Sequence, residues 1–105
     1  MRKIELGMLA AIFSKADKWV DTNTGVYLEE AGNPYGSRSE IYLYGNHIAD
    51  YWHGDGVLPL DSPNLDVDMY TLARWPSMTT KSRLRALGAD VSTIKGVTYL
   101  NGKPV

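Results

Sequence analysis

The stretch EIYLYGNHIADYW, residues 40–52, decides the fold of this 105-residue chain. Residues 40–44 and 47–52 are rich in aromatic and β-branched side chains, which favour strands. Between them stand Gly45 and Asn46, a dipeptide that adopts the two-residue turns matched to the twist of paired strands. The stretch therefore predicts a tight antiparallel hairpin.

Upstream of this hairpin, residues 2–16 show the apolar spacing of an amphipathic helix. The stripe expected to be buried contains Ile4, Met8, Leu9, Ala11, Ile12 and Phe13. Residues 21–25, DTNTG, have the composition of a turn, so a strand is expected from Val26 to Glu30. Residues 32–37 predict a loop that leads into the hairpin.

Downstream of the hairpin, residues 57–60 and 67–72 predict two more short strands. Residues 79–88 predict a second helix, in which Thr79 or Thr80 caps the first turn and Gly88 takes the left-handed conformation after the last. Residues 97–100 predict a strand, and the turn dipeptide Asn101-Gly102 favours a final hairpin with residues 103–105.

These elements together predict an α+β fold in a single domain, residues 1–105. Short strands joined by tight turns favour an antiparallel sheet, here of about four to six strands, with the N-terminal helix and the helix near residues 79–88 on one face. The length fits one hydrophobic core, because domains cluster at roughly 100 to 150 residues.

The composition excludes several classes of protein. The chain contains no cysteine, which rules out disulfide scaffolds, thiol nucleophiles, zinc fingers and iron–sulfur sites. It has no run of about 20 apolar residues and no signal-peptide pattern, so we expect a cytosolic protein without a membrane span. Charge is segregated, with five basic and eleven acidic side chains in residues 1–69 but six basic and one acidic in residues 70–105. This asymmetry indicates either an anionic partner for the basic segment or two segments that neutralise each other in the fold.

The basic segment contains the main candidate binding site, at the start of the second predicted helix. Free amides at a helix N-terminus attract anions, hydroxyl groups add hydrogen-bond donors, and lysine or arginine supplies charge-assisted bonds to phosphate or carboxylate. The candidate residues are Thr79, Thr80, Lys81, Ser82, Arg83 and Arg85. In the alternative interpretation, the threonines cap the helix and the basic residues form a solvated face that pairs with acidic residues elsewhere.

Aromatic side chains form a second candidate surface. Tyr42 and Tyr44 share a face of the predicted hairpin, and Trp75 precedes the second helix. Exposed aromatic residues stack on bases or anchor partner proteins, and the same residue types also fill cores and cross-strand contacts.

The grouping that comes nearest to a metal or acid–base site contains His47, Asp50, His53 and Asp55. Its spacing matches no metal-ligand motif, and the sequence contains no nucleophile elbow, phosphate-binding glycine loop or metalloprotease motif. We therefore expect no metal, no cofactor and no enzymatic activity.

Several short sequence words follow one another in a familiar order. They are KW at 18–19, NTGV at 23–26, GNHIA at 45–49, Trp75 and TTKSRL at 79–84. Through these words the chain resembles a family of small uncharacterised bacteriophage and prophage proteins, whose usual His and Asn are replaced here by Tyr44 and Arg85. The resemblance implies a phage origin and a host-directed accessory role, with no known chemistry.

Two functions follow as hypotheses. The first is an interaction protein that acts in the host bacterial cytoplasm, where it binds a host protein or defence complex and inhibits or redirects it. The second is a binder of nucleic acid or a signalling nucleotide, which holds a phosphate group at Thr79–Arg85. Binding to a phosphate backbone would weaken steeply with salt, whereas a mainly apolar protein interface would change little.

Overall fold

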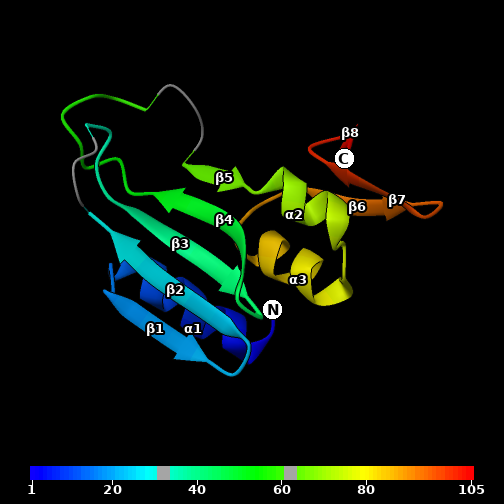
Figure 1. Ribbon diagram of the computed structural model, residues 1–105, viewed down its shortest axis with the longest axis horizontal. Helices are drawn as coiled ribbons and strands as arrows, with labels where there is room; N and C mark the ends of the chain where they lie inside the picture. The colour runs from blue at the N-terminus through cyan, green and yellow to red at the C-terminus, as the bar shows by residue number, and fades with distance from the viewer. Residues whose placement is uncertain (31–33, 61–63) are drawn as a thin grey trace.

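The computed structural model describes residues 1–30, 34–60 and 64–105. The fold is α+β, as predicted, and the described residues form two antiparallel sheets and three helices (Figure 1). In chain order the elements are α1 (Lys3–Phe13), β1 (Lys18–Asp21), β2 (Thr24–Glu29), β3 (Arg38–Leu43), β4 (Asn46–Trp52), β5 (Leu65–Val67), α2 (Met69–Arg74), α3 (Met78–Ala86), β6 (Val91–Ile94), β7 (Val97–Leu100) and β8 (Lys103–Pro104).

The larger sheet has five strands in the order β1-β2-β3-β4-β5, and α1 packs against one of its faces. Figure 1 shows α1 behind this sheet, with the opposite face toward the viewer. Burial along β3 alternates strictly: Ser39, Ile41 and Leu43 are buried on the α1 side, while the residues between them are only partly buried. We call the opposite side the open sheet face; its members include Tyr27, Arg38, Glu40, Tyr42, His47 and Asp50.

The predicted hairpin is confirmed, but its turn lies one residue earlier than expected. Leu43 pairs with Asn46, so Tyr44 and Gly45 are the turn residues. Both have positive φ, 51° and 78°, as the primed two-residue turn requires. Glycine fits the second turn position without a steric penalty. Because the turn ends at Gly45, Asn46 is the first residue of β4.

A β-bulge interrupts the pairing of β3 with β4. Ile41 pairs with Ala49 and Tyr42 with His47, so Ile48 is an extra residue on the β4 side. Ile48 and Ala49 are both buried as a result, although they are consecutive. Because the bulge breaks the alternation of the strand, His47 and Asp50 lie on the same face despite their odd spacing.

The first helix is shorter than predicted, and one of its apolar residues faces outward. The core contains Met8, Ala11, Ile12, Val26, Ile41, Leu43, Ile48, Ala49, Leu72, Leu84, Val91 and Leu100. Phe13 was expected in the buried stripe of the helix over residues 2–16, but it is 64% exposed. The helix ends at Phe13, and Lys15 follows with a positive φ of 53°, which stops the helical path.

Two predicted strands are wrong. Residues 57 and 58 form a bend, and residues 59 and 60 have no regular secondary structure. Residues 67–72 were expected to form a strand, but β5 ends at Val67 and α2 begins at Met69, because the Asp68 side chain accepts a hydrogen bond from the Thr71 N–H and caps the helix. The structure adds β1 and β6, which were not predicted. Residues 32 and 33 of the predicted loop lie outside the described residues.

The second predicted helix corresponds to α3, with shifted ends. Ser77, rather than Thr79 or Thr80, is its N-cap and accepts a hydrogen bond from the Thr80 N–H. Gly88 follows the helix end with a φ of +104°, which confirms the predicted left-handed residue. The final hairpin is also confirmed: Asn101 and Gly102 join β7 to β8, and β6, β7 and β8 form the smaller sheet.

Candidate functional site

The start of α3, the predicted anion site, has many of its polar groups bound within the protein. Thr80 is buried, and its hydroxyl lies 2.8 Å from that of Ser77. Lys81 Nζ donates to Thr93 Oγ1, and Arg85 Nε donates to the Val91 carbonyl at 2.7 Å. Thr79 is half-buried in the first turn.

Arg83 lies in the interior, so the prediction that it faces solvent is wrong. Its side chain is 3% exposed, and its Nη1 donates to Glu5 Oε2 at 2.8 Å. Arg83 Nε donates to Thr24 Oγ1 at 3.0 Å, and Ser82 Oγ donates to the same Glu5 oxygen at 2.6 Å. Burial raises the pKa of Glu5, but the hydrogen bonds from Ser82, the Arg2 N–H and Arg83 outweigh it and hold that pKa below its usual value. This segment therefore joins α3 to α1 and β2.

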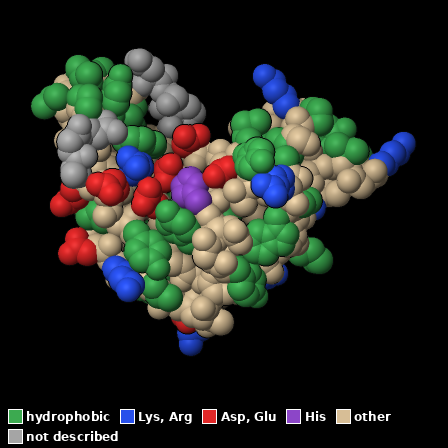
Figure 2. Space-filling view, viewed as in Figure 1, with side chains coloured by type: hydrophobic (Ala, Val, Ile, Leu, Met, Phe, Trp, Pro, Cys, Tyr) green, Lys and Arg blue, Asp and Glu red, His purple; other side chains and the backbone are tan. Residues whose placement is uncertain are grey.

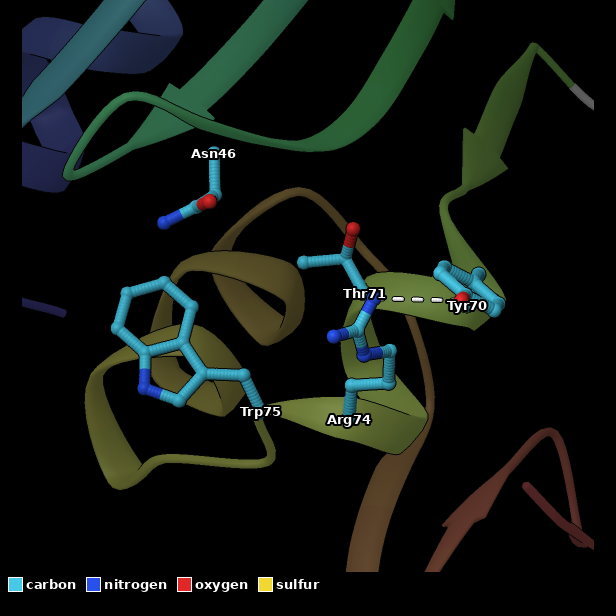
Figure 3. A pocket seen from close by; sticks show the side chains of 5 residues that line it. All are labelled: Asn46, Tyr70, Thr71, Arg74 and Trp75. Carbon is cyan, nitrogen blue, oxygen red and sulfur yellow. Dashed lines mark hydrogen bonds between the residues drawn. The ribbon is translucent and has the colours of Figure 1, made fainter.

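Two of the predicted aromatic residues, Tyr44 and Trp75, lie next to each other, and Trp75 lines a pocket of about 410 Å³. Their ring centroids are 6.0 Å apart. Figure 3 shows the pocket between the β3–β4 hairpin and α2, and we call it the Arg74 pocket. Its lining residues are Asn46, Tyr70, Thr71, Arg74 and Trp75.

Arg74 supplies the positive charge of this pocket. Its Nη1 donates to Tyr70 Oη at 3.2 Å, and its guanidinium carbon lies 5.1 Å from the centroid of the Tyr70 ring. No carboxylate among the described residues is within ion-pair distance of Arg74. An uncompensated guanidinium beside an indole and a phenol can bind a carboxylate or phosphate together with an apolar group.

Helix α2 positions three of the lining residues, Tyr70, Thr71 and Arg74. Sequence reasoning missed Arg74 because residues 67–72 were interpreted as a strand, which would have separated Tyr70 from Thr71 on opposite faces. Asp68 three residues before Thr71 was the signal that could have revealed the helix, since this spacing is typical of an N-cap.

His47 connects the sheet to the start of this helix. Its Nδ1 lies 2.9 Å from Asp68 Oδ2, and its Nε2 lies 2.8 Å from Asp50 Oδ1. Both nitrogens donate at once only in the protonated imidazole. Burial lowers the pKa of His47, but the hydrogen bonds to Asp68 and Asp50 outweigh it and raise that pKa above 6.5. Figure 2 shows acidic side chains gathered beside a histidine on this side of the molecule.

Tyr42, the third predicted aromatic residue, lies on the open sheet face and does not line the Arg74 pocket. Its ring contacts those of Tyr27 and His47 edge-on, with centroids 5.5 and 5.4 Å apart. Burial and then the nearby Glu40 carboxylate raise its pKa. The two phenol rings and the imidazole thus form a cross-strand aromatic row, one of the two roles considered for these residues.

The histidines and aspartates considered as a metal or acid–base grouping lie in separate clusters. His53 Nε2 is 2.8 Å from Ser39 Oγ, whereas Asp55 accepts hydrogen bonds from Lys15 Nζ and Ser37 Oγ, both at 2.7 Å. The Lys15 ammonium, followed by Ser37, holds the pKa of Asp55 well below its usual range. No group of three His, Cys, Asp or Glu suited to a metal ion is found in residues 1–30, 34–60 and 64–105.

No described helix is long and apolar enough to cross a membrane.

Comparison with known proteins places the chain in a family. No curated protein and no solved structure matches the chain. A family model described as Kyanoviridae Gp96 protein matches residues 1–105, the whole length of the sequence. The chain therefore belongs to the Kyanoviridae Gp96 protein family, a family of phage proteins.

Proposed function

We propose that this protein is a phage accessory protein that binds a host protein inside the infected cell through the Arg74 pocket, and thereby inhibits or redirects it. The single observation that carries the proposal is the guanidinium of Arg74, which lines the pocket with Tyr70 and Trp75 and has no carboxylate of the described residues within ion-pair distance. Host defence complexes are one class of target for a protein with this role.

The residue types at the pocket are those that dominate binding energy in protein interfaces. Trp, Tyr and Arg are enriched at hot spots, where a few side chains carry most of the affinity. Tyr44 and Tyr70 are 63% and 70% exposed, which is high for such large rings. A partner that inserts an acidic side chain next to Arg74 and lays an apolar group on Trp75 would also cover the two exposed tyrosine rings.

The phosphate-binding alternative has weaker support. In that hypothesis the basic side chains of residues 79–85 bind the phosphate group. However, Arg83 is paired with Glu5, and Lys81 and Arg85 donate hydrogen bonds to other residues of the protein. Arg74 lies outside that segment.

The experiment has two stages, because the host target must first be identified. Affinity-tagged protein is incubated with host lysate, once untreated and once treated with nuclease, and captured proteins are identified by mass spectrometry. The purified target is then titrated calorimetrically with wild type, Arg74→Ala, Trp75→Ala and the control Lys103→Ala, which removes an exposed positive charge on β8.

We expect Arg74→Ala and Trp75→Ala each to weaken binding by about 30-fold, the size of a hot-spot truncation. Lys103→Ala should bind like wild type. Wild-type affinity in both pocket variants contradicts the proposal, as does capture that disappears on nuclease treatment. Circular dichroism of each variant confirms that the fold is intact.

A further inference from the structure

Helix α1 is apolar on its outer face as well as on its buried face. Leu6 is 57% exposed and Phe13 is 64% exposed, and Ala10 between them is also exposed. The buried side of the same helix is formed by Glu5, Met8, Ala11 and Ile12. A helix at the surface of a monomer normally carries polar residues on its outer side, so an apolar outer side indicates a covered one.

The exposed residues follow the spacing of a helix-pairing surface. Lys3, Leu6, Ala10 and Phe13 are separated by three, four and three residues, the repeat that keeps one stripe of α1 facing a second helix. The stripe is centred on Ala10, with Leu6 and Phe13 at nearly equal distances on either side. Phe13 contacts Tyr51 edge-on with centroids 5.6 Å apart, which fixes its ring at the edge of the stripe.

We propose that the outer face of α1 is the interface of a symmetric homodimer, in which α1 packs antiparallel against α1 of a second copy. A two-fold axis then passes near Ala10, so Leu6 of each copy packs against Phe13 of the other. The small side chain at the centre lets the helices approach closely, and the same patch serves both copies, as in most dimers with two-fold symmetry.

Charge complementarity favours a second copy as the occupant. Lys3 lies in the first turn of α1, where its own helix dipole disfavours a cation, and the last turn contains no basic residue. Antiparallel pairing brings Lys3 of one copy to the negative end of the partner helix, near the exposed Asp17. The formal net charge of −1 adds little repulsion between copies.

The proposed dimer leaves the Arg74 pocket free. None of the lining residues of that pocket belongs to α1. Dimerisation and partner binding are therefore separate properties, and either can fail without the other.

The first test is the mass of the protein in solution, measured by analytical ultracentrifugation over micromolar to submillimolar concentrations. We expect wild type to approach twice the 11.7 kDa of one chain as concentration rises. Leu6→Glu should remain monomeric, whereas the control Met78→Glu, at an 80% exposed position on α3, should dimerise like wild type. A monomeric wild type overturns the proposal, and so does an assembly that Leu6→Glu leaves intact.

The second test locates the contact between the two copies at Ala10, the centre of the stripe. Because the chain has no native cysteine, a single introduced cysteine gives an unambiguous crosslink. Under mild oxidation Ala10→Cys should form a disulfide-linked dimer, since residue 10 of one copy faces residue 10 of the other. The control Lys95→Cys, an exposed position in the turn after β6, should stay largely unlinked. Equal crosslinking of the two variants contradicts an interface centred on Ala10.

Discussion

Removing the Arg83 guanidinium is expected to destabilise the protein severely, although the residue stands in a segment that reads as a charged surface. Arg83→Met keeps much of the side-chain volume but leaves the Glu5 carboxylate, 2% exposed, without its cation. Losing one partner of a buried ion pair costs ~3–5 kcal/mol. Domains of this size have a total stability of about 5–15 kcal/mol, so a large part of the folding free energy would be lost.

The assay is urea denaturation followed by tryptophan fluorescence, since the chain has three tryptophans. The matched control is Arg74→Met, the same substitution at an exposed arginine, which should change stability by less than about 0.5 kcal/mol. The double variant Glu5→Gln with Arg83→Met should lose less than the sum of the two single variants, because it leaves no buried charge unpaired. An Arg83→Met loss as small as that of the control would refute the assignment of a buried ion pair.

The remaining predictions concern pH and the hairpin. The folded pKa of His47 is raised above 6.5, so its stabilising contribution is complete below that pH and is lost as pH rises through the folded value. The folded pKa of His53 is lowered by burial and then by Lys15, so its contribution instead grows as pH rises toward 6.5. We expect the thermal unfolding midpoint of wild type to fall as pH rises through the folded pKa of His47, and that of His47→Gln not to show this fall. The same fall in both proteins would argue against His47 as its source. Gly45→Ala should cost ~1 kcal/mol in urea denaturation, because alanine is strained at the φ of 78°, and an unchanged midpoint would contradict the turn geometry.

Sequence reasoning succeeded where a structure depends on neighbouring residues. The hairpin over residues 40–52, the final hairpin at Asn101-Gly102 and the left-handed Gly88 all follow from local turn chemistry, and the structure confirms them. The α+β class follows from the same local elements. These features require no knowledge of what lies across the core.

The errors arose where a distant residue decides the outcome. Arg83 is interior because Glu5, 78 positions away, faces it from α1, and no local pattern reveals that pairing. Residues 67–72 have strand-forming side chains, but the Asp68 cap and the packing of Leu72 in the core favour a helix. The Arg74 pocket follows from that helix, so its cation was missed while its aromatic neighbours Tyr44 and Trp75 were found.

The extra residue in β4 limits how the length of the chain can change. Loss of one residue between His47 and Asp50 would restore strict alternation with both side chains still on the open sheet face, but it would remove one of the two consecutive buried side chains, Ile48 or Ala49, from the core. Changes of length are far easier to absorb in surface connections, where no buried side chain depends on the spacing of neighbouring residues. Homologous chains of different length are therefore expected to differ in their loops and to retain the interval of two residues between this histidine and this aspartate.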